Sequence, residues 1–538
     1  MRRRGPDLSI GNRVLSTVRP AIGSRSRGMA LDEASRARIA PYVSSLTADV
    51  FSLSGLPEEV IAVLFAYYSR SRDDLRTNLA RLLGDEELDV APEADGRPRR
   101  GLAFASDKAR SFHEKWVVGY GHASVAEHAV VHLAIENVSI VASKVIEDLR
   151  LGSYTEKSTR YVVFDQHSFV DLPELDAEHA AKYKASSERL FATYLDLVPR
   201  VTERLGARSP KPEKMSDAAY KGALRAQACD LLRGLLPAGT RTNIGLTANA
   251  RALEVLLTKM LSHPLEEVRR VAREMHAAAL AVTPTLVKYA APNELRQTLQ
   301  ASVAAAMKRV YTPPDEGVSA TMVINQPVRL VRYDKDALER VALALAYDGS
   351  DPGVHAYNLG DALHRATLPE LIGIAKAACE KRGPYDAPPR AFEASTMTFE
   401  LMLDYGAYRD LQRHRMLTPA TQRLTCRLGF ETPQALSDLG HAEAYQDAML
   451  AARDAWNAME ERYPLESQYA VPLGFRVRTL WTLNLRELFH VIELRSAKQG
   501  HTSYRRMAQG LYRTAITVHP WLKDLIRVDL NDYALARS

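Results

Sequence analysis

Two segments of this chain occur twice in the same order, and this repetition restricts the folds that the chain can adopt. Residues 246–253 read Leu-Thr-Ala-Asn-Ala-Arg-Ala-Leu, and residues 481–488, which lie 235 positions later, read Trp-Thr-Leu-Asn-Leu-Arg-Glu-Leu. A second match, offset by about 265 positions, aligns Arg150 with Arg415. Long segments that recur once and in order indicate a duplicated domain, whereas a solenoid would show a period of roughly 20–50 residues.

The length of the chain allows two complete copies of such a domain. A single hydrophobic core rarely grows beyond about 300 residues, and this chain has 538. Prolines and a glycine at 313, 314 and 317 mark a break between the copies, because these residues interrupt helices and strands. We therefore expect a tail at 1–28, an N-terminal domain at 29–310, a linker at 311–324 and a C-terminal domain at 325–538.

The composition is typical of a soluble globular protein, with 46% hydrophobic and 25% charged residues. No apolar run in the sequence approaches the ~20 residues that span a bilayer, so we expect no membrane partner. The three cysteines, Cys229, Cys379 and Cys426, have neither metal-binding spacing nor the spacing of a disulfide framework. A reduced, cytoplasmic protein is the simplest interpretation.

The net charge of +6 arises in the first 28 residues, which contain seven arginines and one acid. The rest of the chain is therefore close to neutral. A tail rich in Ser, Gly and Arg is expected to be disordered and solvated. A basic tail can also serve as a nucleic-acid arm, but a solvated tail is the commoner case, so we do not expect a nucleic-acid partner.

Hydrophobic periodicity predicts an α+β fold in each half, rich in helices and with small mixed sheets. Alternating apolar and polar residues predict strands at 328–332 and 396–402. Residues 130–139 are apolar and fit either a strand or a buried helix. Polar residues predict loops at 153–161 and 417–426. Helices are expected at 57–83, 140–149, 336–347, 404–415, 447–462, 484–494 and 502–518. A helix-rich stretch, interrupted by Pro237, Gly239 and Pro264, is expected at 217–280.

Three short motifs suggest the chemistry of the protein. Residues 121–128 read Gly-His-Ala-Ser-Val-Ala-Glu-His, residues 153–161 read Ser-Tyr-Thr-Glu-Lys-Ser-Thr-Arg-Tyr, and residues 413–415 read Arg-His-Arg. Together they resemble the signature of the flavin-dependent thymidylate synthases, which has Gly-His-x4-Glu-His, then Arg-His-Arg, then Ser-x2-Glu-x-Ser-x-Arg-Tyr. The repeated Asn-x-Arg-x-Leu segments resemble a helix of that family that ends in Leu-Arg. The resemblance covers most of residues 45–535 and implies a tandem, fused member with two copies of the family's fold.

The matched signature is divided between the two copies. The N-terminal copy has the substrate loop at 153–161, but residues 148–150 read Asp-Leu-Arg where the family has Arg-His-Arg. The C-terminal copy keeps Arg-His-Arg, but residues 416–425 lack the Glu-x-Ser-x-Arg spacing, and both histidines of the Gly-His motif are lost. Only the C-terminal copy keeps the Leu-Arg pair, as Leu494 and Arg495. Complementary losses of this kind are compatible with one site that both halves share.

The resemblance implies reductive methylation of dUMP to dTMP, with methylenetetrahydrofolate as the carbon donor and NADPH as the reductant of FAD. In that family, FAD and dUMP bind between the subunits of a tetramer. A fused pair should imitate a dimer, and a homodimer of this chain should form a pseudo-tetramer. Arg160 and Arg233 suit the nucleotide phosphate, because guanidinium groups bind oxyanions in a bidentate way. Arg495 suits the uracil carbonyls, where negative charge develops during the transfer.

The resemblance also assigns the candidate site residues. The catalytic residues are expected to be Arg495, Ser158 and Arg160. The substrate-binding residues are expected to be Glu156, Ser158, Arg160, Arg233 and Arg495. The FAD-binding residues are expected to be His122, Arg413, His414, Arg415, Asn249, Arg251, Asn484, Arg486 and His501. We expect no metal site, because the sequence has no Cys-x2-Cys pair and no His-Glu-x2-His motif.

Other functions remain open on sequence grounds. The altered residues 148–149 and the eroded loop at 416–425 allow a flavoenzyme of the same fold that acts on another pyrimidine nucleotide. Duplication followed by decay allows a non-catalytic paralogue that binds nucleotide or flavin. Taken singly, His122 fits a structural histidine, residues 413–415 fit a solvated helix end, and Asn249 fits a helix cap. The reaction therefore depends on whether the two half-signatures meet in the folded protein.

Overall fold

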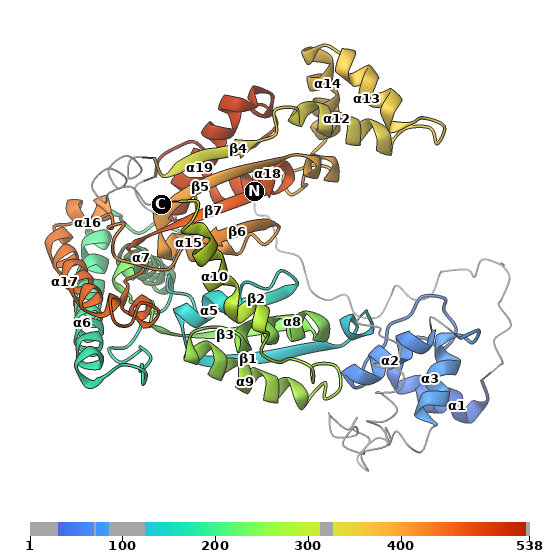
Figure 1. Ribbon diagram of the computed structural model, residues 1–538, viewed down its shortest axis with the longest axis horizontal. Helices are drawn as coiled ribbons and strands as arrows, with labels where there is room; N and C mark the ends of the chain where they lie inside the picture. Colours follow the sequence, from blue (N-terminus) through green and yellow to red (C-terminus); the bar gives the residue numbers. More distant parts are fainter. Residues whose placement is uncertain (1–30, 69–70, 85–123, 312–325, 534–538) are drawn as a thin grey trace. The chain divides into compact units, whose positions relative to one another are not determined.

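The computed structural model describes residues 31–68, 71–84, 124–311 and 326–533 (Figure 1). The chain forms two compact units, Met1–Ala129 and Val130–Ser538. The predicted tail and all but the first residue of the predicted linker lie outside the described residues. Within the described ranges, no helix is both long and apolar enough to cross a bilayer.

The described residues of the first unit form three short α-helices: α1 (Glu33–Ile39), α2 (Glu58–Tyr68) and α3 (Leu75–Leu83). Asp32 and Asp74 begin α1 and α3, because each carboxylate accepts a hydrogen bond from a backbone N–H of the first turn. The helical pattern at 57–83 therefore corresponds to two helices, since Asp74 starts a new one. The helices of this unit bury apolar side chains that include Val60, Val63, Leu64, Leu79 and Leu82.

The second unit contains two antiparallel sheets, one in each copy of the repeat (Figure 1). The N-terminal sheet has the strand order β1-β3-β2, with β1 (Val130–Ser139), β2 (Gly152–Glu156) and β3 (Arg241–Asn249). The C-terminal sheet has the order β4-β5-β7-β6, with β4 (Val328–Tyr333), β5 (Thr396–Asp404), β6 (Leu417–Thr421) and β7 (Arg476–Asn484). The predicted tandem α+β fold is confirmed, but the sheets are antiparallel rather than mixed.

The two copies have the same order of elements around these sheets. The N-terminal copy has α5 (Ile140–Ile146) after β1, and then α8 (Ala250–Leu261) and α9 (Glu266–Leu280) after β3. The corresponding helices of the C-terminal copy are α15 (Tyr405–Gln412), α18 (Leu485–Arg495) and α19 (Thr502–Val518). Asn249 and Asn484 begin α8 and α18 in the same way, since each side chain accepts a hydrogen bond from a backbone N–H of the first turn. The repeated Asn-x-Arg-x-Leu segments thus form the same strand-to-helix turn twice.

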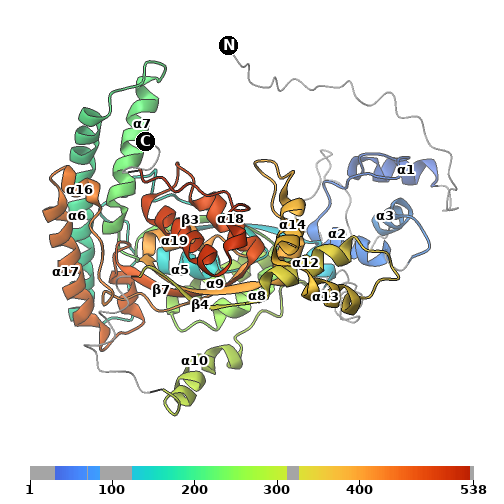
Figure 2. The same cartoon turned by 90° about the horizontal axis from the view of Figure 1, so that it is seen from above.

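Long helices from both copies lie side by side (Figures 1 and 2). Helix α6 (Ala177–Arg208) packs against α7 (Asp217–Leu232) of its own copy and against α17 (Ala442–Glu460) of the other copy. The backbone N–H of Asp176 donates to the hydroxyl of Tyr463 at 3.2 Å and fixes the start of α6 to the C-terminal copy. The remaining α-helices among the described residues of this unit are α10 (Glu294–Met307), α12 (Ala337–Asp348), α13 (Ala356–Arg365), α14 (Leu368–Cys379) and α16 (Gln434–Asp438).

Reciprocal hydrogen bonds join the copies across a short antiparallel bridge between two prolines. The backbone N–H of Ala238 donates to the carbonyl of Val471 at 2.8 Å, and that of Leu473 donates to the carbonyl of Leu236 at 2.8 Å. The 235-residue offset relates the two donors, Ala238 and Leu473, and also the two acceptors, Leu236 and Val471. The second bond is therefore the equivalent of the first, with the two copies exchanged. The two copies are therefore related by a local two-fold axis at this bridge.

The sequence predictions are wrong at three short strands. Residues 241–249 lie in the stretch at 217–280 that is predicted to be rich in helices, with no strand expected, but they form β3. Its buried face consists of Thr242, Ile244, Leu246 and Ala248, and this mixture of threonine, alanine and large apolar residues obscures the alternation. The predicted loops at 153–161 and 417–426 contain β2 and β6, which are edge strands paired with β3 and β7. The segment at 130–139, which fitted either type of element, is a strand.

Candidate functional site

The loop after β2 of the N-terminal copy contacts helix α19 of the C-terminal copy. Arg160 in this loop forms two hydrogen bonds with the carboxylate of Asp230, 2.5 Å from Nε to Oδ1 and 2.8 Å from Nη2 to Oδ2. Its Nη1 donates to the hydroxyl of Tyr504 on α19 at 3.3 Å. Bidentate pairs of arginine and carboxylate have a fixed geometry, so Arg160 has a defined orientation at the boundary between the copies.

Tyr504 connects this loop to Arg495, the last residue of α18. The guanidinium carbon of Arg495 lies 5.4 Å from the centroid of the Tyr504 ring, and that of Arg160 lies 5.8 Å from the same centroid. The Nε of Arg495 also donates to Nε2 of His414 at 2.8 Å. One aromatic ring therefore joins Arg160, from the first half-signature, to Arg495 and His414, from the second.

Acidic residues of the N-terminal copy meet the basic end of α15. Arg409 Nη2 lies 2.5 Å from Glu156 Oε1, and Arg413, one turn later, lies 3.9 Å from Glu156 Oε2 and 3.7 Å from Glu147 Oε1. Burial, together with the nearby charge of Glu156, raises the pKa of Glu147 to about 7. The side chain of Arg413 is 46% exposed, whereas the two carboxylates are at most 6% exposed. Arg413 therefore has room for a further anionic partner.

Arg233 is almost fully buried, and one of its nitrogens has no hydrogen-bond partner among the described residues. Its Nη1 lies 3.0 Å from Oδ2 of Asp410 on α15. Its Nη2 is buried and makes no hydrogen bond within the part of the chain that the structure describes. Leaving such a donor unpaired costs about 1–3 kcal/mol. An oxyanion at this position would satisfy it.

His501 and Ser158 also belong to this cluster. The Nδ1 of His501 accepts a backbone N–H at the start of α19, so Nε2 carries the hydrogen and donates to the carbonyl of Asp230, 3.2 Å away. Burial, and after it the charge of Arg233, lowers the pKa of His501 to about 4, which keeps the ring neutral near pH 7. The Oγ of Ser158 accepts the backbone N–H of Arg160 at 3.2 Å and thereby shapes the loop.

Arg415 and Arg150 form a reciprocal pair across the copies. Arg415 donates to the carbonyl of Gly152, and Arg150 donates to the carbonyl of Leu417 at 3.0 Å. The 265-residue offset relates Arg150 to Arg415 and Gly152 to Leu417, so the two bonds are equivalent. The guanidinium of Arg415 also lies 5.6 Å from the ring centroid of Tyr154. Arg415 therefore helps to hold the copies together, whatever it contributes to a ligand.

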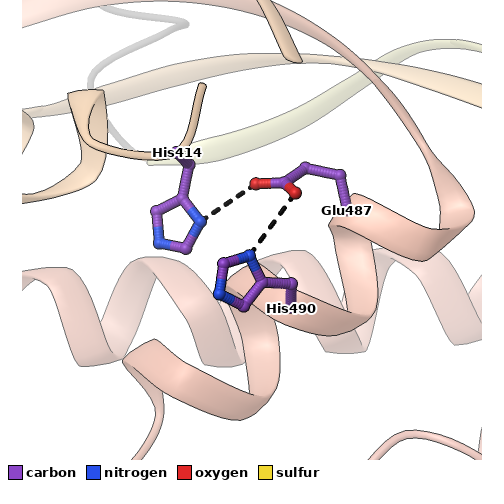
Figure 3. A group of neighbouring side chains, drawn as sticks. All are labelled: His414, Glu487 and His490. Atoms are coloured by element: carbon purple, nitrogen blue, oxygen red, sulfur yellow. Dashed lines mark hydrogen bonds and ion pairs between the residues drawn. The ribbon is translucent and has the colours of Figure 1, made fainter. Parts of the chain in front are cut away.

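His414, Glu487 and His490 form a compact group (Figure 3), and His414 contacts Arg495. The Nδ1 atoms of the two histidines lie 3.0 Å and 3.4 Å from different oxygens of the Glu487 carboxylate. Burial lowers the pKa of His414 to about 4. Burial acts to raise the pKa of Glu487, but hydrogen bonds from both histidines outweigh it and lower that pKa to about 2. The three potential ligand atoms lie within 4.8 Å of one another.

A profile of the family described as "Thymidylate synthase complementing protein" matches residues 64–285 and 329–521. This chain belongs to that family. It is 35% identical to a UPF0159 protein of Chlamydia pneumoniae over 511 residues, which are 92% of this chain and 94% of that protein. It is 30% identical to a UPF0159 protein of Thermoplasma acidophilum over 514 residues, which are 88% of this chain and 96% of that protein. It is 31% identical to a flavin-dependent thymidylate synthase of Mycobacterium sp. (strain KMS) over 227 residues, which are 38% of this chain and 87% of that protein.

Family membership confirms the resemblance seen in the sequence, but the predicted site residues do not all lie in the cluster around Tyr504. Asn249 and Asn484 use their side chains to cap α8 and α18. Arg486 forms an ion pair within its own copy, and Arg251 lies exposed on α8. His122 lies outside the described residues. The FAD contacts of these five residues remain predictions.

The cluster of this family member also contains five residues that the sequence interpretation missed: Arg409, Asp410, Asp230, Tyr504 and Glu487. Local spacing could have identified two of them. Asp230 lies three residues before Arg233, and Arg409 lies four residues before Arg413, so each pair falls on one helix face. Tyr504 has no such signal, because its partner Arg160 is 344 positions away.

The two-fold relation creates an equivalent position elsewhere in the chain, but its residues differ. The 265-residue offset relates Arg160 to Thr425. The 235-residue offset relates Asp230 to Leu465, Arg233 to Gln468 and Arg495 to Met260. None of these four side chains is charged, so they cannot form the same ion pairs. Among the described residues, this charged set therefore occurs at one of the two positions.

A hollow of about 870 Å³ lies elsewhere, between β4 and α19. Three arginines contribute to its lining: Arg329, Arg506 and Arg513. None of the predicted site residues lines it. The candidate site is therefore defined by the convergence of charged groups around Tyr504 and not by this hollow.

Proposed function

We propose that this chain is an FAD-dependent thymidylate synthase, which methylates dUMP to dTMP with methylenetetrahydrofolate and NADPH as co-substrates. The observation that carries the proposal is the contact of Tyr504 with Arg160 and Arg495, since it brings together signature residues that the two copies retain separately. The flavin-dependent thymidylate synthase of Mycobacterium that is similar to part of this chain supports the same reaction.

The phosphate of dUMP is assigned to Arg160 and Arg233. Each arginine is already held by a carboxylate, Arg160 by Asp230 and Arg233 by Asp410, so little side-chain entropy is lost on binding. The unpartnered Nη2 of Arg233 can donate to a phosphate oxygen. Ser158, next to Arg160, offers a hydroxyl to the same group. Glu156 contributes indirectly, because its ion pair with Arg409 fixes the start of the loop.

The uracil ring is assigned to Arg495. Methylene transfer to the uracil ring places negative charge on its carbonyl oxygens, and a preoriented cation stabilises that charge. Arg495 is preoriented because its Nε donates to His414 and its guanidinium lies over Tyr504. Both contacts also exclude water from one side of the guanidinium, which strengthens its interaction with a developing anion.

The residues present fit a flavin dinucleotide by charge. Arg413 is exposed, and its carboxylate neighbours lie 3.7–3.9 Å away, so its cation is only partly neutralised. We assign Arg413, with Arg415, His414 and His501 nearby, to the diphosphate and ring of FAD. Bound FAD, reduced by NADPH, would supply the electrons that convert the transferred methylene to a methyl group. The chain itself binds, orients and supplies charge.

One such site is proposed for each chain, because the equivalent position has lost the charged set. A homodimer of the chain would then correspond to the family's tetramer, but it would keep only half of the tetramer's binding sites. We place the reaction in the cytoplasm, where the three cysteines would remain reduced.

The proposal is tested by supplying purified protein with FAD, dUMP, methylenetetrahydrofolate and NADPH, and by measuring dTMP with chromatography. A yellow protein that forms dTMP is expected. A colourless protein that stays free of flavin after incubation with FAD would contradict the proposal. A yellow protein that converts another pyrimidine nucleotide but not dUMP would instead support the second function left open by the sequence.

A further inference from the structure

We propose that Glu487 is a positioning residue, which acts through His414 to hold Arg495 in the orientation that the reaction needs. The inference rests on the proposed function for what Arg495 does, but not for how Arg495 is held. Glu487 carries no assigned role in the family signature found in this sequence. Glu487 contacts His414 (Figure 3), and His414 in turn contacts Arg495, so the three residues form a continuous chain of hydrogen bonds.

The direction of each hydrogen bond follows from chemistry. The Nε of an arginine can only donate, so Nε2 of His414, 2.8 Å away, must be the acceptor. A neutral imidazole has one donor and one acceptor nitrogen, and therefore Nδ1 of His414 carries the hydrogen. That hydrogen is donated to Oε1 of Glu487 at 3.0 Å. The carboxylate thus selects the tautomer in which Nε2 can accept from Arg495.

Glu487 is itself held rigidly. It is the third residue of α18, and its backbone N–H donates to the side chain of Asn484 at 2.8 Å. Its second oxygen faces Nδ1 of His490 at 3.4 Å. The His490 ring packs edge-on against the ring of His414, with centroids 4.8 Å apart. The carboxylate therefore cannot turn away from His414 without losing contacts on both sides.

The opposite tautomer would disturb Arg495. If Nε2 of His414 carried the hydrogen, two N–H groups would face each other over the 2.8 Å that now form a hydrogen bond. Arg495 would then turn, and its contact with the Tyr504 ring would be lost. A residue that fixes the tautomer can therefore control the position of a cation that it does not touch.

A metal ion bound by His414, Glu487 and His490 is the main alternative explanation of this group. A histidine that binds a metal usually donates its other ring N–H to an acceptor. Here the other ring nitrogen of His414 faces Arg495, which is a donor. A metal on Nδ1 would leave two donors in contact, so the hydrogen-bonded arrangement explains the geometry better.

The test compares Glu487→Ala and Glu487→Gln with the wild-type chain, and His490→Ala serves as the matched control. Nitrogen-15 NMR of labelled histidine reports which ring nitrogen of His414 carries the hydrogen, with assignment by a His414→Gln variant.

Glu487→Ala should shift His414 toward the Nε2–H form and reduce kcat for dTMP formation about 10- to 100-fold. Glu487→Gln should restore both to near the wild-type values, because its amide oxygen can still accept from Nδ1–H. His490→Ala should retain the wild-type tautomer, because it removes only the longer contact of 3.4 Å and leaves the bond of 3.0 Å between Glu487 and His414 in place. Circular dichroism confirms that each variant is folded.

The outcomes separate this inference from the proposed function, because the tautomer is measured without nucleotide or flavin. If His414 keeps its Nδ1–H form in Glu487→Ala, the inference is wrong even when the wild-type chain makes dTMP. If the tautomer depends on Glu487 but the wild-type chain makes no dTMP, the positioning of Arg495 stands and the proposed function fails. Stoichiometric binding of Zn²⁺ that disappears in Glu487→Ala would show a metal site and overturn the inference.

Discussion

Arg160, in a loop of the N-terminal copy, donates a hydrogen bond of 3.3 Å to the hydroxyl of Tyr504, in a helix of the C-terminal copy. The two residues lie 344 positions apart in the chain. Their contact joins a substrate-loop arginine to a ring that also contacts Arg495. Neither copy has this combination of groups, so the fused pair is the smallest unit that can form the proposed site.

Replacement of Arg160 by lysine should weaken nucleotide binding. Lysine keeps the charge but cannot form the two-pronged pair with Asp230. We expect the dissociation constant for dUMP, measured by titration calorimetry, to rise about 10- to 100-fold, since a hydrogen bond to a charged group contributes roughly 1.5–3 kcal/mol. Thr425→Ala, at the equivalent position of the other copy, is the matched control and should leave the affinity unchanged. Equal effects of both substitutions would contradict the assignment.

Glu147 should make the stability of the protein depend on pH. Its folded-state pKa is raised to about 7 by burial and by Glu156, above the unfolded value near 4.5. The protonated form is therefore favoured in the folded state, and the associated stability is present below about pH 4.5 and is lost as the pH rises through 7. Glutamine does not ionise, so Glu147→Gln removes this loss of stability. The free energy of unfolding of the variant minus that of the wild-type chain should therefore be larger at pH 8 than at pH 5, by about 1–3 kcal/mol.

Urea denaturation of both proteins at the two pH values measures this difference. His414 and His501, with folded-state pKa values lowered from 6.5 to about 4, gain protons near pH 6.5 only in the unfolded state. Both proteins contain these histidines, so their contribution cancels in the difference. The same stability difference at pH 5 and pH 8 would show that Glu147 does not titrate in this interval.

How much of this could be predicted from the sequence depended on the distance between interacting residues. The repeated Asn-x-Arg-x-Leu segments predicted the duplication, because a local turn with its asparagine cap depends on neighbouring residues. The pairing of Arg233 with Asp410 could not be predicted, because the two residues are 177 positions apart and meet only when the copies pack. Strand β3 was missed because its buried face includes threonine and alanine, which are only weakly apolar. The alternation of apolar and polar residues that identifies a strand is therefore unclear in its sequence.

Gly474 should be required for the packing of the two copies. A Cβ atom there would lie 2.9 Å from the Cε of Met449 and 3.2 Å from the carbonyl oxygen of Gly234 in the other copy. We expect Gly474→Ala to destabilise the protein by about 1–3 kcal/mol through overpacking. Gly222→Ala is the control, because Gly222 lies in a helix with no atom near its missing Cβ. That substitution should stabilise by roughly 0.5–1 kcal/mol. Thermal melts of the two variants that shift in the same direction would argue against this role of Gly474.

The proposed site should bind one FAD per chain. The equivalent position has Asp148 and Leu149 in place of Arg413 and His414, so it lacks cations that an anionic cofactor needs. Flavin absorbance of the saturated protein, divided by its chain concentration from amino-acid analysis, should give a ratio near one. A ratio near two would mean that both positions bind flavin.

The central claim is that residues of both copies form one site within a single chain. It is tested most directly by coexpressing an Arg160→Ala chain and an Arg495→Ala chain with different tags, purifying any assembly that contains both, and measuring dTMP formation. Each variant alone should lose about 100- to 1,000-fold in kcat. We predict that the mixed assembly is as inactive as the separate variants, because every chain has one damaged site. Recovery of a quarter or more of the wild-type rate would contradict the claim, since it would show that the two arginines act across different chains.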